Sequence, residues 1–149
     1  MKQIIVKVFN SCNQKLPEYE TSGASGMDLR ASQAVVIPPG ITMLVPTGIY
    51  CEIPEGYEFQ IRPRSGISLK TKMRITNAPG TIDSDFRGQI QVIVENQGEF
   101  DVFISEGDKI AQMILCPVVK CLWDVQDDLS CLLDTSRGEG GFGSTSNQK

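Results

Sequence analysis

The sequence contains no histidine among its 149 residues. This absence excludes nucleophile systems of the Ser-His-Asp and Cys-His kinds, and it excludes every zinc centre that histidine ligates. Acid–base chemistry must therefore depend on a carboxylate, and a hard cation such as Mg²⁺ is the natural helper of such chemistry.

Three further features of the composition restrict the possible classes of protein. No block of lysines and arginines is dense enough to follow a nucleic-acid backbone, and the net charge is −4, so we expect a small anionic ligand rather than a nucleic-acid polymer. Lys7 interrupts the only apolar stretch near the N-terminus, which predicts neither a signal peptide nor a membrane span but a cytoplasmic protein. The five cysteines are odd in number and form no C-x-x-C pair, which favours reduced thiols over disulfides or structural zinc.

The chain has the length of one ordinary domain and reads as a series of short strands. Turn signals separate apolar runs at residues 38–40 (PPG), 46–48 (PTG) and 54–56 (PEG). Apolar residues alternate with others at 49–53, 57–61, 90–94 and 100–104, and a further apolar run covers 110–119. No window of normal length has a helical stripe. This pattern predicts an all-β sandwich or barrel.

The composition changes after Leu133. Residues 134–149 contain four of the 14 glycines, and Phe142 is their one large apolar residue. Such a segment cannot build a core and stays mobile until a ligand or partner orders it. We therefore expect a β-barrel domain over residues 1–133 and a flexible, glycine-rich C-terminal arm over residues 134–149.

The arm contains two motif matches that fail in context. Gly138, Gly140 and Gly143 spell G-x-G-x-x-G, but a dinucleotide site needs a following helix, and only six residues remain. A P-loop would need lysine where Ser144 stands. The physical features that remain are freely oriented backbone N–H groups and a forked cation, both suited to phosphate, and an aromatic ring suited to stacking on a base.

Five sequence clusters occur in a characteristic order. They are SGASGMDLRA (22–31), RPRSGIS (62–68), NAPGTIDSDFRG (77–88), EGDKIAQMIL (106–115) and RGEGGFGST (137–145). In order and spacing they resemble the five motifs of the trimeric dUTPase family, whose members split dUTP into dUMP and pyrophosphate. The resemblance covers nearly the whole chain. It implies a jelly-roll-like β-barrel with one short helix, and a homotrimer whose active sites each draw residues from all three subunits.

The resemblance also implies a catalytic residue. The residues alone do not distinguish Asp83 from Asp85, since both are carboxylates in one turn. The family motif places at Asp83 the base that activates the water attacking the α-phosphate. A carboxylate within hydrogen-bond reach of that water is a competent base.

Phosphate binding is implied for residues of three motifs. The set comprises Arg64, Ser65, Gly66, Gln112 and Arg137, and the arm residues Phe142, Gly143 and Ser144 complete it over the base and the phosphates. Mg²⁺ would be held mainly by the triphosphate, with Asp28 as a candidate partner in the outer coordination shell.

Nucleoside binding is implied for the third motif and the strand after it. Uracil would pair with Asn77 and with backbone groups of Gly80, Thr81 and Ile82, with a further main-chain contact near Gln91. Phe86 stands where most relatives carry tyrosine, whose ring packs under deoxyribose. Ser146 replaces the glycine that usually ends the fifth motif.

Two alternatives remain at this point. A dCTP deaminase shares the fold but aims its base at the cytosine ring. A non-catalytic β-module would keep the pocket for regulation only. The complete motif set favours a hydrolase, which would limit uracil incorporation into DNA and supply dUMP for thymidylate synthesis.

Overall fold

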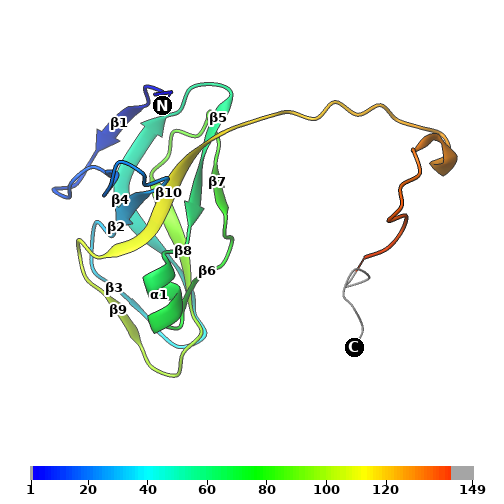
Figure 1. Cartoon of the computed structure of the whole chain (residues 1–149). Coiled ribbons are helices and arrows are strands. Elements are labelled where there is room, and N and C mark those ends of the chain that lie inside the picture. The colour runs from blue at the N-terminus through cyan, green and yellow to red at the C-terminus, as the bar shows by residue number, and fades with distance from the viewer. Residues whose placement is uncertain (1, 142–149) are drawn as a thin grey trace. The chain divides into compact units, whose positions relative to one another are not determined.

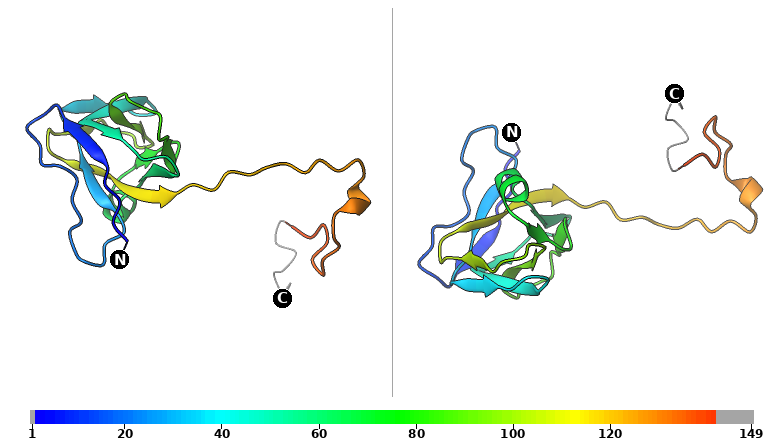
Figure 2. Two further views of the ribbon diagram at one scale, coloured as in Figure 1. Left: turned by 90° about the horizontal axis from the view of Figure 1, so that it is seen from above. Right: turned by 90° about the horizontal axis from the view of Figure 1, so that it is seen from below.

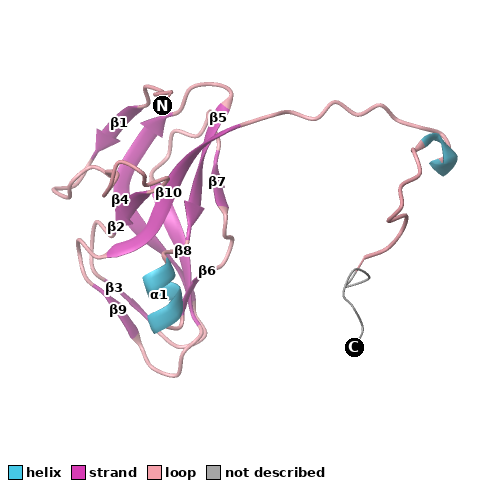
Figure 3. Cartoon of the chain, in the orientation of Figure 1, coloured by secondary structure: helices cyan, strands magenta, loops and turns pink. Residues whose placement is uncertain are grey.

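Alternating side-chain burial defines the strands of this protein. Along β8 (Ile90–Asn96) every second residue is buried, and β5 (Tyr57–Arg62) buries Phe59 and Ile61 in the same way. The structure is a computed structural model that describes residues 2–141. In agreement with the prediction, it is mostly β-structure with one short α-helix (Figures 1 and 3).

The strands form three antiparallel sheets. The first has the order β1-β4-β8-β6, the second β2-β10-β5-β7, and the third pairs β3 with β9. Figure 2 shows these strands surrounding a common interior. The remaining strands are β1 (Lys7–Asn10), β2 (Met27–Arg30), β3 (Val35–Ile37), β4 (Thr42–Glu52), β6 (Met73–Ile75), β7 (Gly80–Ile82), β9 (Val102–Ile104) and β10 (Lys109–Pro117).

All three sheets contribute to one hydrophobic core. Val92 of β8, Leu29 of β2 and Ile37 of β3 are each completely buried. Because the core receives apolar side chains from every sheet, burial fixes the register of the strands that carry the site residues.

One predicted turn is wrong. The prolines and glycines at residues 38–40 and 54–56 do form turns, but β4 continues through residues 46–48. Pro46 pairs with Gln91 and Ile49 with Ile90, so the two residues between form a bulge. Gly48 has φ +72° there, a conformation that favours glycine. The Thr47 hydroxyl donates to the Ile90 carbonyl oxygen at 2.6 Å and ties the bulge to β8.

Helix α1 (Ser65–Lys70) follows β5 and contacts β6 (Figure 1). Arg64 before it has extended backbone (φ −89°, ψ 132°), and the first helical hydrogen bond runs from the Ser68 N–H to the Arg64 carbonyl oxygen. The amide groups of the first turn therefore precede the helical hydrogen-bond ladder.

The chain divides into two compact units, Met1–Val119 and Lys120–Lys149. Within the second unit, the 3-10 helix η1 (Leu129–Cys131) is capped by the Asp128 carboxylate, which accepts from the Ser130 N–H at 2.8 Å. The predicted boundary after Leu133 stays a prediction. Over the described residues, no helix has both the length and the apolar character needed to cross a membrane.

Candidate active site

A cavity of about 240 Å³ lies beside strand β7, and we call it the β7 cavity. Its lining includes all six residues of the third motif and the following strand that are predicted to bind the nucleoside, and it adds four that were not predicted. The predicted residues are Asn77, Gly80, Thr81, Ile82, Phe86 and Gln91, and the missed ones are Leu44, Ile61, Gln89 and Ile93.

The missed residues carried a signal in the strand pattern. Gln89, Gln91 and Ile93 alternate with the buried residues of β8, so they share one face. Leu44 is the pairing partner of Ile93 on β4. Gln89 is held in place, because its Nε2 donates to the Tyr50 hydroxyl at 3.1 Å and its Oε1 accepts from the Gly48 N–H at 3.4 Å.

Strand β7 is the last strand of its sheet. It pairs on one side with β5, where Gly80 is opposite Ile61 and Ile82 is opposite Phe59. Within the described residues its other edge has no strand partner, so backbone N–H and C=O groups remain for a flat polar ligand. The Asn77 amide lies close to Gly80 of this strand, with Nδ2 3.0 Å from the position that a Cβ on Gly80 would take.

The two candidate bases come after β7, Asp83 immediately and Asp85 two residues later. Asp83 and Asp85 are both exposed, and neither lines a described cavity that contains predicted site residues. Asp83 is adjacent to Ile82 of the β7 cavity, and its carbonyl oxygen accepts from the Phe86 N–H at 3.2 Å. Asp83 and Phe86 therefore belong to the same turn.

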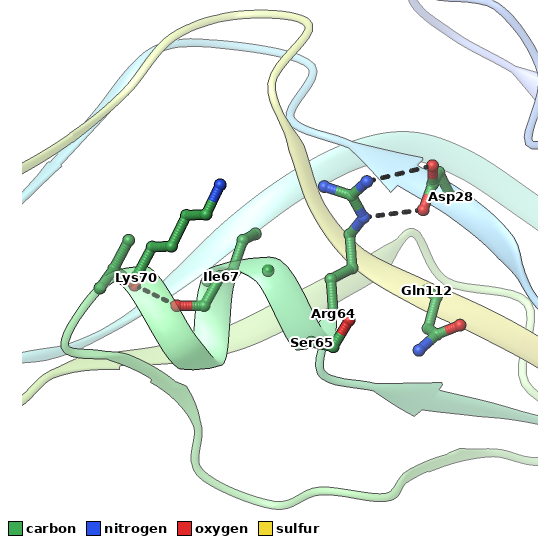
Figure 4. Close-up of a pocket in the computed structure, with 8 residues that line it drawn as sticks. Asp28, Arg64, Ser65, Ile67, Lys70 and Gln112 are labelled. Atoms are coloured by element: carbon green, nitrogen blue, oxygen red, sulfur yellow. Dashed lines mark hydrogen bonds and ion pairs between the residues drawn. The ribbon is translucent and has the colours of Figure 1, made fainter.

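A second cavity, of about 470 Å³, lies beside helix α1, and we call it the α1 cavity. It brings together most of the residues predicted to bind phosphate, as Figure 4 shows. The lining consists of the predicted Asp28, Arg64, Ser65, Gly66 and Gln112, with Ile67, Lys70 and Thr71 as additions. The family resemblance predicted one short helix, whereas the six residues by themselves give no clear helical period.

Ion pairs fix the charges in the α1 cavity. The Asp28 carboxylate accepts from Arg64 Nε at 2.8 Å and lies 2.8 Å from Lys109 Nζ, and Lys109 also pairs with Glu20. Burial by itself raises the pKa of Asp28, but the hydrogen bond from Lys109 and the charge of Arg64 outweigh it and lower this pKa. Hydrogen bonds to Asp28 and Glu20 raise the pKa of Lys109. Asp28 is thus a carboxylate with two cationic partners.

Gly26 allows the close approach of Gln112, which lines the same cavity. A Cβ at this position would lie 2.6 Å from Gln112 Oε1, so the glycine leaves room for the amide of Gln112. The Gln112 Nε2 donates to the Pro63 carbonyl oxygen at 2.9 Å. Gly66 differs, since nothing lies within 4 Å of the position of its absent Cβ, and space above the helix is open to a ligand.

The predicted nucleoside and phosphate residues of the first unit lie in two separate cavities. The β7 cavity and the α1 cavity have no lining residue in common. Arg137 belongs to the second unit, where its Nε donates to the Gly140 carbonyl oxygen at 2.6 Å. Phe142, Gly143 and Ser144, together with Ser146, lie outside the described residues.

The sequence matches one protein family over most of its length. The model of the dUTPase family matches residues 12–146. A deoxyuridine 5'-triphosphate nucleotidohydrolase of Roseobacter denitrificans is 51% identical over 133 residues, which cover 87% of this chain and 86% of that protein. One of Brucella melitensis is 46% identical over 145 residues, which cover 95% of this chain and 90% of that protein.

Solved structures share the fold. The dUTPase of Staphylococcus bacteriophage 80alpha with dUPNHPP has a TM-score of 0.86 at 24% identity, covering 95% of this chain and 98% of that one. A mutant dUTPase from phage phi11 of S. aureus, described with a structural Mg(II) ion, has a TM-score of 0.77 at 22% identity, covering 85% and 99%. These similarities confirm the predicted fold class.

Proposed function

This chain belongs to the dUTPase family, and on that premise we propose how its two cavities and its arm hydrolyse dUTP to dUMP and pyrophosphate. The observation that supports this arrangement is that the predicted residues divide between the two cavities. Those predicted to bind the nucleoside line the β7 cavity, and most of those predicted to bind phosphate line the α1 cavity. The reaction would limit uracil incorporation into DNA and supply dUMP for thymidylate synthesis.

The test is pyrophosphate release from dUTP, dTTP, dCTP and UTP, each with and without Mg²⁺. We expect rapid release from dUTP alone, and only with the cation. Ammonia released from dCTP would instead indicate a deaminase, and tight binding of dUTP without any product would indicate a regulatory module.

Uracil recognition is assigned to the free edge of β7. The backbone of Gly80, Thr81 and Ile82 and the Asn77 amide would hydrogen-bond the polar edge of the base, and the strand at Gln91 would add a main-chain contact. A cytosine in this place would leave polar groups of the cavity unpaired, which costs binding free energy. The ring of Phe86 would pack under deoxyribose and exclude a 2′-hydroxyl.

Asp83 is proposed as the general base. It would accept a proton from the water that attacks the α-phosphate in line with the departing pyrophosphate. Its place directly after Ile82 supports this role, because a nucleoside in the β7 cavity would bring its α-phosphate close to the following turn. The general-base contribution is about 10²- to 10⁴-fold in rate.

The α1 cavity is proposed to hold the phosphate chain. Arg64, the Ser65 hydroxyl, backbone N–H groups at Gly66 and the amide of Gln112 would surround the oxygens and neutralise their charge. Arg64 is already oriented by Asp28, so less conformational freedom is lost when phosphate binds.

Mg²⁺ fits this cavity as an ion carried mainly by the substrate. No group of three or more potential ligands occurs among the described side chains, and Asp28 is the one carboxylate among the residues that line the cavity. Such a donor set suits an ion that keeps water and binds phosphate oxygens. When bound, the cation would supply charge neutralisation at the phosphates.

A homotrimer with shared sites is proposed because one chain keeps its nucleoside and phosphate residues in separate cavities. The β7 cavity of one subunit would face the α1 cavity of the next, and the arm (residues 134–149) would close over them. Arg137 would then reach the phosphates, Phe142 would stack on uracil, and Gly143 and Ser144 would contact the phosphates. Truncation after Ser136 should leave a folded oligomer with severely reduced kcat/KM.

Subunit mixing tests the sharing of sites. Asp83→Asn and Arg64→Gln each impair a different side of the site, so each variant alone should have little activity. If the two sides come from different subunits, a refolded mixture would contain about a quarter of complete sites. Activity in the mixture no higher than in the separate variants would contradict shared sites.

A further inference from the structure

The ring of Phe86 rests directly on Gly88. A Cβ built on Gly88 would lie 2.6 Å from Phe86 Cζ and 3.0 Å from Cε2, well inside the contact distance that real Cβ atoms show. The ring could not keep its position above any residue other than glycine. Either the ring or the backbone beneath it would have to shift.

The backbone conformation does not explain this glycine. Positive φ angles occur in the described chain at Gly40, Gly48, Gly56, Gly107 and Gly138, and Gly88 is not among them. Alanine is therefore compatible with the backbone at residue 88. The close approach of the ring is the physical reason for glycine at this position.

The turn that carries the ring is held by several hydrogen bonds. The Phe86 N–H donates to the Asp83 carbonyl oxygen at 3.2 Å, and Arg87 Nη1 donates to the carbonyl oxygens of Ser84 at 2.7 Å and Phe86 at 2.9 Å. Because these bonds fix the backbone of the turn, added volume at Gly88 would displace the ring rather than the chain.

The ring also borders the β7 cavity. Phe86 lines this cavity, whereas Gly88 does not. We propose that Gly88 is a positioning residue for sugar recognition. Because Gly88 has no side chain, the Phe86 ring can lie close to the backbone of residue 88. This position of the ring leaves the cavity wide enough for deoxyribose but too narrow for ribose. This inference rests on the proposed binding of dUTP in the β7 cavity.

A methyl group at residue 88 would push the ring toward the sugar. For Gly88→Ala we expect kcat/KM for dUTP to fall about 10- to 100-fold, since displacement of about 1 Å has effects of this size. The loss should appear mainly in KM, because the chemical groups at Asp83 are untouched. The ratio of kcat/KM for dUTP to that for UTP should not fall, because a narrower cavity excludes ribose at least as strongly as deoxyribose.

A double-mutant cycle with Phe86→Ala tests the mechanism. Without the ring, Gly88→Ala has nothing to displace, so it should change kcat/KM by less than about twofold in that background. Equal losses in the two backgrounds would overturn the inference, and so would a Gly88→Ala enzyme with unchanged kinetics and nucleotide preference.

The folding of the variants gives an independent measurement. If Gly88→Ala alone failed to fold and the double variant folded, the clash with the ring would be the cause, which supports the inference. Failure of both variants to fold would refute it. The wild-type assay separates this inference from the proposed function: a wild-type protein that does not hydrolyse dUTP contradicts the function itself.

Discussion

The β7 cavity and the α1 cavity differ in how they are built. No charged side chain is among the residues that line the first, which strands and the segments flanking β7 form from apolar, amide and hydroxyl groups. The lining of the second includes Asp28, Arg64 and Lys70. If one substrate occupies both cavities, as proposed, shape would select it on one side and charge on the other.

This contrast has measurable consequences. Shape and neutral hydrogen bonds discriminate between nucleotides and depend little on salt, whereas a charged site treats all triphosphates alike and weakens as salt screens it. Substitutions in the β7 cavity should therefore change ratios between substrates. Substitutions in the α1 cavity should change the affinity for every triphosphate.

The largest effect is expected from the loss of the proposed general base. Asp83→Asn keeps the size of the side chain but removes its basicity, so kcat for dUTP should fall about 10²- to 10⁴-fold. Binding of a non-hydrolysable dUTP analogue, measured by calorimetry, should change less than about threefold. Asp85→Asn is the matched control, since Asp85 is also an exposed carboxylate of the same turn, and it should stay active. Normal turnover by Asp83→Asn would contradict the proposed role of Asp83 as the general base.

Arg64→Gln tests the charged cavity. Loss of a charge-assisted hydrogen bond to phosphate, worth about 1.5–3 kcal/mol, should lower kcat/KM for dUTP about 10- to 100-fold. The loss should shrink as salt is raised, whereas the loss caused by Phe86→Ala should not. A salt-independent effect of Arg64→Gln would show that this contrast between the cavities is wrong.

Arg62→Gln is the matched control for that variant. The Arg62 guanidinium bonds Gln60 Oε1 at 2.6 and 3.1 Å and is not among the residues lining either cavity. Its replacement should leave the kinetics of the wild type unchanged at every salt concentration.

Sequence reasoning predicted the two cavities unequally well. Alternation along β8 places Gln91 and its neighbours on one face, so the missed Gln89 and Ile93 could have been inferred from Gln91. The pairing of Asp28 with Lys109 could not, because long-range contacts between β2 and β10 depend on register. A proline and a glycine at residues 46–48 indicated a turn, but local propensity does not reveal a bulge that the neighbouring strand stabilises.

The ion pairs of Asp28 in the α1 cavity should contribute to the free energy of unfolding. Its pKa is lower in the folded protein than its ordinary value of 3.8, so the ionised carboxylate stabilises the fold above that pH. The stabilisation is lost as the pH falls below 3.8 through the folded value. Asp28→Asn should lower the free energy of unfolding by about 1–3 kcal/mol at pH 7. Melting temperatures of wild type and variant, at one protein concentration, should converge below pH 3.8.

Glu52→Gln controls for the general loss of a carboxylate. Glu52 pairs with Lys7 at 2.9 Å, but both side chains are at least half exposed, and such surface pairs contribute little. The melting temperature at pH 7 should not change. An Asp28→Asn protein as stable as this control at pH 7 would refute the structural role of the ion pairs.

The smallest effect is expected from Phe86→Tyr. This variant tests whether the β7 cavity discriminates between deoxyribose and ribose by shape alone. The ring is retained and a hydroxyl is added on Cζ, the ring atom that lies over Gly88. If the ring excludes ribose by volume, the preference for dUTP over UTP should change less than about fivefold, since one neutral hydrogen bond contributes about 0.5–1.5 kcal/mol. A larger gain would mean that a hydroxyl makes a specific bond that this chain lacks. In that case discrimination in the β7 cavity would depend on polarity as well as shape, and the contrast with the α1 cavity would narrow.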